Sequence, residues 1–409
     1  MKSCRHCKTP LEHTFLDLGC TPPSNSYLNK EDLNRAEIHL PLKIKVCNQC
    51  WLVQTEDYID AESLFSPEYA YFSSTSNSFL LHAKNYSDKI INYCDLNDKS
   101  FVVEIASNDG YLLKNFTKKN IPCLGIEPTK STAEVAEKLN IPVLRKFFSE
   151  ALAKKLVSEG KKADLIIGNN VYAHVPDIND FTKGLKTILK PGGTITLEFP
   201  HLMRLINQTQ FDTIYHEHFS YLSLNTVCRI FSKIGLRVLQ IEEILTHGGS
   251  LRVYGCHQDD RRETTKSVHE LLKEEVAQGL KDLKTYINFK ERVNKIRDDL
   301  VLFLIEQKRS GNKVVAYGAA AKGNTILNYA GIKNDLLKLV VDKSIYKQGK
   351  FLPSSRIPIV SEEKIIELKP QYVLIMPWNI KDEIIEQLSY IKKWDGKFVV
   401  AIPEIKIIK

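Results

Sequence analysis

The chain contains 409 residues, more than one hydrophobic core usually supports, so two or three domains are expected. No apolar run is long enough to cross a membrane, and the start MKSCRHCKTP lacks the apolar stretch of a signal peptide, which favours a cytoplasmic protein with no membrane partner. The net charge of +8, from 57 basic and 49 acidic residues spread along the chain, suits an anionic ligand without the concentrated basic stripe of a nucleic-acid-binding protein.

Two pairs of cysteines near the start of the chain form the turns CRHC and CNQC. Such turns can place four thiolates around one tetrahedral zinc ion, and four protein ligands leave no open position for catalysis. The alternatives are two unrelated turns or a redox pair, and His6 or His13 could replace a thiolate. The expected ligands of this structural zinc site are Cys4, Cys7, Cys47 and Cys50. The other five cysteines are expected to be reduced and to serve only packing.

An alternation of strands and helices begins near residue 101, after an expected linker at residues 56–78 and an amphipathic helical stretch. Such alternation is typical of a parallel, doubly wound sheet. The strands are expected at 101–106, 122–128, 141–148, 163–171 and 194–200, with helices such as 131–139 and 181–189 between them. A strand pair at 236–245 and 249–258 is expected to extend this sheet with an antiparallel edge.

A largely helical stretch at about 262–309 separates this alternation from a second one. Strands are expected there at 313–319, 336–344, 371–378 and 397–404. The pattern predicts a second, smaller α/β domain at the C-terminal end.

The first strand of the middle domain runs into the turn EIASNDGYLLKNF. Glu104 ends that strand, and residues 108–110 form a turn into a helix, where small or turn-forming residues let backbone approach a ligand. Glu127 ends the second strand, where a carboxylate can accept hydrogen bonds from both hydroxyls of a ribose. These features predict a nucleoside pocket. Ala106 and Asn108 stand where a dinucleotide fingerprint has glycine, which disfavours NAD.

The fourth strand ends in GNNVYAHVPD, which places Asn169, Asn170 and His174 at the carboxyl edge of the sheet. Asn170 and His174 are four residues apart, so a helical turn would present both to the ligand crevice. For a single histidine in this position, a helix-capping or core role is the alternative.

The segment TIYHEHFSY follows the fifth strand and can lie across the same crevice. A metal role would require His216 and His218 with a further carboxylate, and the chain offers no obvious third partner. Acid/base work is favoured, because histidine has the side-chain pKa nearest to working pH. A neighbouring carboxylate such as Glu217 would fix the tautomer of the base.

The order of these motifs is distinctive. The strand-end carboxylate, the short glycine turn, the ribose-binding carboxylate and LKPGGTITLEFP resemble the class I S-adenosylmethionine-dependent methyltransferases. Together with the CxxC pairs, YAYFSS, NNVYAHVPD, YHEHFSYLS, HGGSLRVY, YGAAAKGNT and VDKSIYKQGKFLP, they make the whole chain closely resemble the nucleotide-sugar C-methyltransferases. Members of that family attach a methyl branch to a carbon of a keto-sugar carried on a nucleoside diphosphate, in deoxysugar biosynthesis.

The resemblance implies three domains and two cofactors. A zinc-binding domain is expected at 1–65, a Rossmann-like methyltransferase domain at 66–295 and a smaller Rossmann-like domain at 296–409. The implied cofactors are S-adenosylmethionine and structural zinc. The implied substrate is a nucleotide-sugar, with C3 of a 4-keto-deoxysugar as the expected acceptor and a monomer or weak dimer as the expected assembly.

The resemblance also implies roles for individual residues. His218 is the implied general base, which removes the proton next to the sugar ketone. That proton is only weakly acidic, so donors such as His174, Asn170 or Tyr215 are needed to stabilise the enolate oxygen. The implied catalytic residues are His218, Glu217, Tyr215, His174, Asn170 and Tyr69, with Tyr71 as the alternative to Tyr69. The implied cofactor-binding residues are Glu104, Ala106, Asn108, Asp109, Gly110, Glu127, Phe148 and Asn169.

The C-terminal domain carries AYGAAAKGNT, a strand followed by a turn rich in glycine and alanine and by a helix start. Its backbone amides and Lys322 could hold a diphosphate, although a purely structural turn is the alternative. The resemblance suggests that Gly318, Lys322 and Asn324 help to bind the nucleotide-sugar. Two other classes remain open: an NAD(P)-dependent nucleotide-sugar oxidoreductase and a zinc-finger nucleic-acid adaptor.

Overall fold

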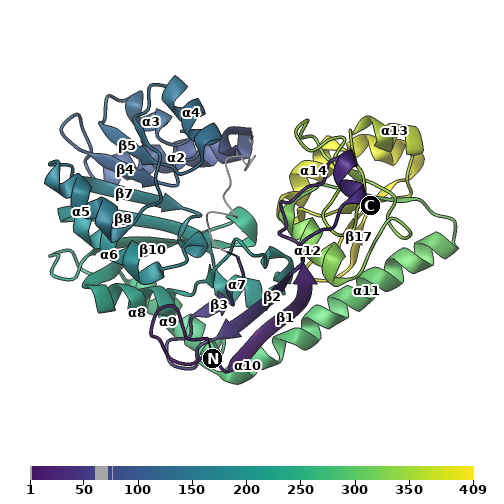
Figure 1. Ribbon diagram of the computed structural model, residues 1–409, viewed down its shortest axis with the longest axis horizontal. Coiled ribbons are helices and arrows are strands. Elements are labelled where there is room, and N and C mark those ends of the chain that lie inside the picture. Colours follow the sequence, from purple (N-terminus) through teal and green to yellow (C-terminus); the bar gives the residue numbers. More distant parts are fainter. Residues whose placement is uncertain (1, 60–71, 76) are drawn as a thin grey trace.

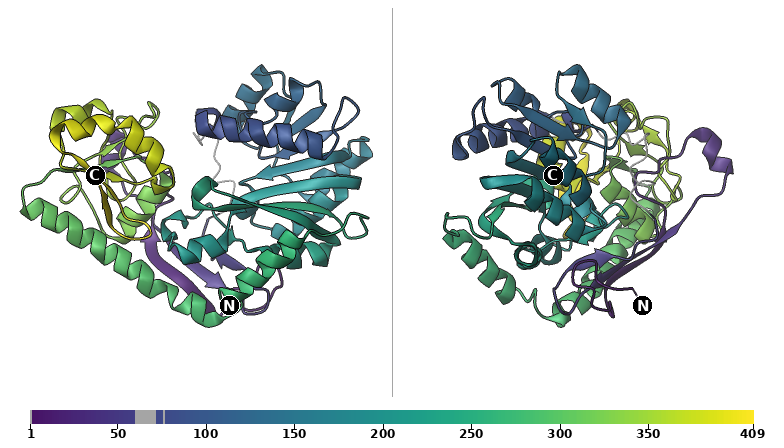
Figure 2. Two further views of the ribbon diagram at one scale, coloured as in Figure 1. Left: turned by 180° about the vertical axis from the view of Figure 1, so that it is seen from behind. Right: turned by 60° about the vertical axis from the view of Figure 1, so that its left-hand side comes forward.

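The computed structural model describes residues 2–59, 72–75 and 77–409, which form three sheets. Two α/β lobes lie side by side, with a small antiparallel sheet at their base and the long helix α11 running beneath (Figure 1). Seen from behind, α11 spans the lower edge of the molecule from one lobe to the other (Figure 2). Among the described residues, no helix is both long and apolar enough to cross a membrane.

The small N-terminal sheet has four antiparallel strands in the order β1-β2-β3-β9. The strands are β1 (His13–Thr21), β2 (Leu40–Val46), β3 (Val53–Thr55) and β9 (Ser220–Tyr221). The fourth strand is the end of the TIYHEHFSY segment, whose Tyr221 pairs with Val53. The N-terminal sheet therefore holds the segment that the sequence singles out for acid/base chemistry.

The methyltransferase-like lobe contains a seven-stranded sheet in the order β10-β11-β8-β7-β4-β5-β6. The strands are β4 (Val102–Ile105), β5 (Cys123–Ile126), β6 (Val143–Leu144), β7 (Ala163–Asn169), β8 (Leu189–Pro200), β10 (Leu236–Ile244) and β11 (Ser250–His257). β4 to β8 run parallel, and β11 pairs antiparallel with both β8 and β10. The predicted parallel sheet with an antiparallel edge is confirmed, although the expected strand at 141–148 shrinks to two residues.

Helices cover both faces of this sheet, as the alternating pattern predicts. They are α2 (Asn77–Tyr93), α3 (Lys114–Thr117), α4 (Lys130–Lys138), α5 (Glu150–Ser158), α6 (Ile178–Ile188) and α8 (Leu224–Ile234). The short helix α7 (Leu202–Asn207) follows β8 and packs mainly in the buried cluster of the N-terminal sheet. α8 shows how local sequence sets the bounds. The Ser223 side chain accepts a hydrogen bond from the Thr226 amide at its start, and Gly235 (φ 85°) ends it in the left-handed conformation.

The helical stretch predicted at 262–309 consists of α9 (Lys266–Ala277), α10 (Leu283–Ile287) and α11 (Phe289–Arg309). α11 carries Phe289, whose ring stacks on that of Phe15 in β1 with 4.7 Å between centroids. One buried cluster joins side chains of the N-terminal sheet, α11 and the C-terminal lobe. This shared core fixes the two lobes to a common base.

The C-terminal lobe contains a six-stranded sheet in the order β14-β13-β12-β15-β16-β17. Its strands are β12 (Val314–Tyr317), β13 (Val340–Val341), β14 (Ile359–Val360), β15 (Tyr372–Ile375), β16 (Lys397–Val400) and β17 (Lys406–Ile408). Its helices are α12 (Ala321–Tyr329), α13 (Glu363–Leu368) and α14 (Lys381–Gln387). The smaller α/β domain is confirmed, with β14 and the antiparallel β17 added to the four expected strands.

Candidate functional site

The four N-terminal cysteines form one compact cluster. Their sulfur atoms all lie within 4.8 Å of one another, with 3.5 Å between the sulfurs of Cys4 and Cys50 and of Cys7 and Cys47. Zinc–sulfur bonds of about 2.3 Å in a tetrahedron require sulfur separations of about 3.8 Å, so the cluster has the size of a zinc site. The four thiolates would fill all four coordination positions of the zinc ion. No position would be left open for a reacting group, so the ion would stabilise the structure.

Neither nearby histidine belongs to the cluster. His6 Nδ1 lies 2.7 Å from Asn179 Oδ1, and His13 Nε2 lies 3.4 Å from Asn48 Nδ2. Arg5 reaches in the same direction as His6 and donates a hydrogen bond of 2.6 Å to the Pro176 carbonyl. The zinc cluster therefore braces the loop that follows His174.

A single cavity of about 1410 Å³ lies between the lobes. It joins the carboxyl edge of the seven-stranded sheet, the TIYHEHFSY segment and the start of α12. The predicted site residues on its wall are Ala106, Asn108, Glu127, Phe148, Asn169, Asn170, His174, Tyr215, Glu217, His218 and Lys322. Five predicted residues are absent from the described wall: Glu104, Asp109, Gly110, Gly318 and Asn324. Tyr69 and Tyr71 lie outside the described residues.

Glu127 organises the end of the cavity at which the sequence predicts a nucleoside. Its two carboxylate oxygens accept hydrogen bonds of 2.9 Å from the backbone amides of Asn108 and Thr129. Ala106 (φ 57°) and Asn108 (φ 50°) both adopt the left-handed conformation. Strain of this kind persists where the surrounding structure enforces it, which is common at ligand sites.

Three predicted residues of this turn and its strand, Glu104, Asp109 and Gly110, lie behind the cavity wall. A Cβ on Gly110 (φ 76°) would lie 2.5 Å from Ile141 Cδ1, so only glycine fits against α4 and its following turn. Asp109 Oδ2 accepts a hydrogen bond of 3.0 Å from the Ser74 amide. Burial raises the pKa of Glu104 well above its usual value, and the carboxylates of Glu127 and Asp109 raise it further.

The end of the cavity at which the sequence predicts acid/base chemistry contains two imidazoles. His218 Nδ1 lies 2.9 Å from the Thr213 carbonyl oxygen, and His174 Nδ1 lies 2.8 Å from the Glu217 carbonyl oxygen. A carbonyl can only accept, so each Nδ1 carries the proton and each Nε2 presents a lone pair. The two rings meet edge to face with 4.6 Å between centroids, and the Tyr215 ring lies 4.1 Å from that of His218.

Burial keeps both imidazoles uncharged. It lowers the pKa of His174 to about 4 and that of His218 well below its usual value, and the neighbouring His174 lowers the latter further. Burial also raises the pKa of Glu217, whose Oε1 accepts a hydrogen bond of 3.2 Å from Asn25 Nδ2. An uncharged His218 can accept a proton through Nε2, as a general base must.

His216 points away from the cavity. Its Nε2 lies 3.3 Å from the Leu40 carbonyl of β2. Among the described residues, the four cysteines are the one group of three or more ligand side chains close enough to share a metal ion. Within the described residues, the YHEH segment therefore does not form a metal site.

The C-terminal lobe contributes Lys322 to the cavity. Its Nζ donates a hydrogen bond of 2.6 Å to Asn379 Oδ1 and lies 4.7 Å from the centre of the Trp378 ring. Burial lowers the pKa of Lys322 to about 8, although the nearby Asp212 opposes this shift. Gly318 and Asn324 lie off the cavity wall: a Cβ on Gly318 would lie 2.5 Å from Pro377 Cδ, and Asn324 Nδ2 donates to the Ser24 carbonyl.

Sequence reasoning assigned no role to two further wall residues, His247 and Lys347. His247 belongs to the motif HGGSLRVY, which was a visible signal without a chemical interpretation. Lys347 belongs to VDKSIYKQGKFLP, and its Nζ donates a hydrogen bond of 2.7 Å to the Ala319 carbonyl just before α12.

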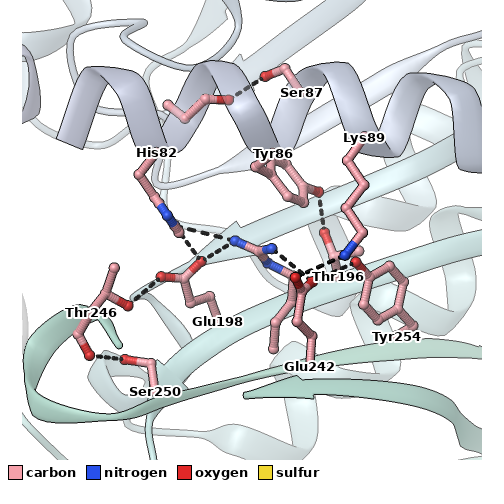
Figure 3. Close-up of polar contacts among 12 residues, drawn as sticks. His82, Tyr86, Ser87, Lys89, Thr196, Glu198, Glu242, Thr246, Ser250 and Tyr254 are labelled. Carbon is pink, nitrogen blue, oxygen red and sulfur yellow. Dashed lines mark hydrogen bonds and ion pairs between the residues drawn. The ribbon is translucent and has the colours of Figure 1, made fainter. Parts of the chain in front are cut away.

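A buried ionic network anchors the turn that carries His247 (Figure 3). Glu198 of β8 is fully buried and accepts hydrogen bonds from Arg252 (2.7 Å), His82 (3.1 Å) and Thr246 (3.1 Å). Burial alone would raise the pKa of Glu198, but His82 and Arg252 outweigh it and lower the pKa to about 2. Thr246 precedes His247 directly, so the network sets the position of this turn.

Three family models match the chain in sequence order. They are described as "Putative zinc binding domain" (residues 4–65), "Methyltransferase domain" (80–241) and "C-methyltransferase C-terminal domain" (245–403). The C-methyltransferase NovU of Streptomyces niveus is 33% identical over 99% of this chain and 96% of its own length.

Solved structures give weaker matches. A S-adenosylmethionine-dependent methyltransferase of Anabaena variabilis is 15% identical over 49% of this chain and 97% of its own, with a TM-score of 0.39. One of Clostridium acetobutylicum is 14% identical over 42% of this chain and 91% of its own, with a TM-score of 0.35. Each covers less than half of the chain, so the full-length relative carries more weight.

Proposed function

Because the chain belongs to the S-adenosylmethionine-dependent C-methyltransferase family, we propose that it methylates a carbon next to the ketone of a nucleotide-linked sugar. We propose C3 of a 4-keto-deoxysugar as the acceptor, in the biosynthesis of a branched sugar. The family assignment replaces the oxidoreductase and the nucleic-acid adaptor considered from the sequence.

One observation carries this proposal. The predicted nucleoside pocket at Glu127, the imidazole pair of His174 and His218, and Lys322 of the other lobe line the same cavity. A methyl donor at the sheet edge and a nucleotide-sugar reaching in from the C-terminal lobe would meet at the imidazole pair. Proximity of this kind removes much of the entropic cost of joining two substrates.

The donor residues at the sheet edge fit S-adenosylmethionine. Glu127 would accept from the ribose hydroxyls, Asn169 ends β7 on the wall of the same cavity, and Phe148 would supply an apolar surface for the base. Asn169 Oδ1 is buried without a hydrogen-bond partner among the described residues, so it can receive a donor from the ligand. When bound, S-adenosylmethionine supplies a methyl group on a positively charged sulfur.

His218 would perform the first chemical step. Its Nε2 lone pair accepts the proton from C3, while the Nδ1–H bond to Thr213 holds the ring in the required tautomer. Glu217 is held between Asn25 and the protein interior, and the Tyr215 ring covers one side of the base. The resulting enolate carbon would then take the methyl group.

The test combines two readouts on a panel of nucleoside-diphosphate-linked 4-keto-deoxysugars. In deuterated water, the wild-type protein is expected to exchange the C3 proton of at least one panel member and to methylate it with labelled S-adenosylmethionine. His218→Asn is expected to lose both activities by about 10²-fold or more while S-adenosylhomocysteine still binds. Exchange that persists in His218→Asn would remove this residue as the base.

A further inference from the structure

The enolate formed in such a reaction needs hydrogen-bond donors at its oxygen. His218 and His174 cannot serve while uncharged, because both use Nδ1–H on backbone carbonyls and present only Nε2 lone pairs to other partners. The donors expected from the sequence are therefore incomplete, since His174 was among them. Asn170 and Tyr215 remain on the wall as neutral donors, and a cation on the same wall would stabilise the oxyanion more strongly.

Lys322 lies on α12, which contacts the same segment, Asp212 to Ile214, that holds His218. The Thr213 carbonyl holds His218, and the preceding residue, Asp212, accepts a hydrogen bond of 2.7 Å from Trp378 Nε1. Lys322 Nζ lies 4.7 Å from the Trp378 ring centre. α12, which carries Lys322, is fastened to this segment by Thr325 Oγ1, which donates 3.0 Å to the Ile214 carbonyl. This places the ammonium group on the wall beside the imidazole pair.

The two lysines of the cavity wall differ in their carboxylate neighbours. Lys347 Nζ lies 3.8 Å from the carboxylate of Asp342, whereas Lys322 forms no ion pair among the described residues and has Asp212 near enough to raise its pKa. Burial lowers the pKa of His247 most and the charge of Lys322 lowers it next, whereas the same charge is the smallest of the causes that lower the pKa of His218, after burial, His174 and His247. The ammonium group of Lys322 can thus attract a negative charge that develops near these two histidines.

His247 also lines the cavity, on a turn that lies against Trp378. A Cβ on Gly248, the next residue, would lie 2.3 Å from Trp378 Cη2, so the turn packs directly on that ring. His247 itself has a left-handed backbone (φ 57°), and its Nδ1 is buried without a partner among the described residues. An uncharged imidazole keeps one N–H group and can donate it without competing for the proton.

We propose that Lys322 and His247 form the site that stabilises the enolate oxygen, an inference that rests on the proposed methyl transfer. When the C3 proton moves to His218 Nε2, the C–H electron pair becomes the C3–C4 π bond and the carbonyl π pair moves to the oxygen. The ammonium of Lys322 and an N–H of His247 face that oxygen. C3 then bonds to the methyl carbon, the C–S pair leaves with sulfur, and the oxygen pair restores the carbonyl.

This role differs from binding the diphosphate, and kinetics separate the two. C3 exchange in deuterated water is measured at saturating substrate, with S-adenosylhomocysteine bound and with the panel member that the wild type uses. Lys322→Met is expected to slow exchange by about 10²-fold or more with KM within about threefold, because one oxyanion donor is worth about 10²–10³-fold. Lys347→Met is expected to raise KM, and the exposed Lys343→Met is the matched control with wild-type kinetics.

Conservative variants test the chemistry at each position. Lys322→Arg keeps the charge and is expected to retain more exchange than Lys322→Met. His247→Asn keeps an N–H and tolerates the left-handed backbone, so it is expected to exceed His247→Phe. Binding of S-adenosylhomocysteine by calorimetry shows that each variant is folded.

Two results would overturn the inference. One is a Lys322→Met protein whose KM rises more than about tenfold while exchange at saturation stays within about threefold, which would make Lys322 a diphosphate ligand. The other is equal exchange in Lys322→Arg and Lys322→Met. Failure of the proposed function looks different, because the wild type would then neither exchange nor methylate any panel member.

Discussion

Replacing Glu198 by glutamine tests the ionic network that anchors the His247 turn. The change would leave the Arg252 guanidinium, which is almost fully buried, beside a neutral amide. Breaking a buried pair by removing one partner typically costs about 3–5 kcal/mol. Arg252 keeps a second carboxylate, Glu242, at 3.1 Å, so a loss near the lower end of that range, about 3 kcal/mol, is expected at pH 7.

The pKa of Glu198 gives an independent magnitude. Its folded value of about 2 lies below the ordinary 4.5, so ionisation stabilises the fold above pH 4.5 and this stability is lost as pH falls toward 2. The difference of about 2.5 pH units corresponds to about 3 kcal/mol at 1.36 kcal/mol per unit. By linkage, about 2 kcal/mol of this remains at pH 3.5. The two routes therefore agree on the size of the effect.

Urea unfolding of the wild type and of Glu198→Gln at pH 7 and pH 3.5 measures both numbers. The penalty of the substitution is expected to fall by about 1 kcal/mol between the two pH values. Glu243→Gln is the matched control, since Glu243 forms an exposed pair with Arg204, worth at most about 1 kcal/mol. A penalty below about 1 kcal/mol at pH 7, or one that does not shrink at pH 3.5, would refute the reasoning.

Two further predictions concern the cofactor sites. Chelation, or Cys47→Ser, is expected to release one zinc ion per chain and to lower methyl transfer by about tenfold or more. The physical reason is that Arg5 and His6 would no longer hold the loop after His174. Full activity in protein shown to be zinc-free by metal analysis would contradict this. Glu127→Ala is expected to weaken S-adenosylhomocysteine binding by about 10–100-fold in calorimetry, because the ribose and two backbone amides lose a charged acceptor. The affinity for the nucleotide-sugar is expected to stay unchanged. If wild type and variant bind S-adenosylhomocysteine equally well, the ribose lies elsewhere.

Features encoded in contiguous sequence were predictable. The strands of both α/β lobes follow short apolar runs, and the residues at their carboxyl ends, such as Glu127 and Asn170, reach the cavity wall as expected. The two cysteine pairs also predict their cluster, because the CxxC spacing of the ligands is visible within a few residues. In these cases a short window of residues already determines which groups meet.

Features that depend on distant segments were not predictable. Nothing local shows that Tyr221 pairs with Val53, or that Asn324 turns to the Ser24 carbonyl and leaves the cavity wall. The role of His247 depends on Trp378, more than a hundred residues later, and on a buried network spread over four elements. The motif HGGS is visible in the sequence, but it does not show which side chains surround His247.

The zinc domain explains why the acid/base segment can be short and still rigid. β9, at its C-terminal end, is paired to β3, which follows Cys50 closely, while the Ile214 carbonyl at its start accepts from Thr325 of the other lobe. The N-terminal region also reaches that lobe directly, since Leu28 forms a β-bridge with Phe351. His218 is therefore fixed between two anchors that belong to different domains. Loss of zinc should thus disturb the base through the backbone of its own segment, without any contact between metal and substrate.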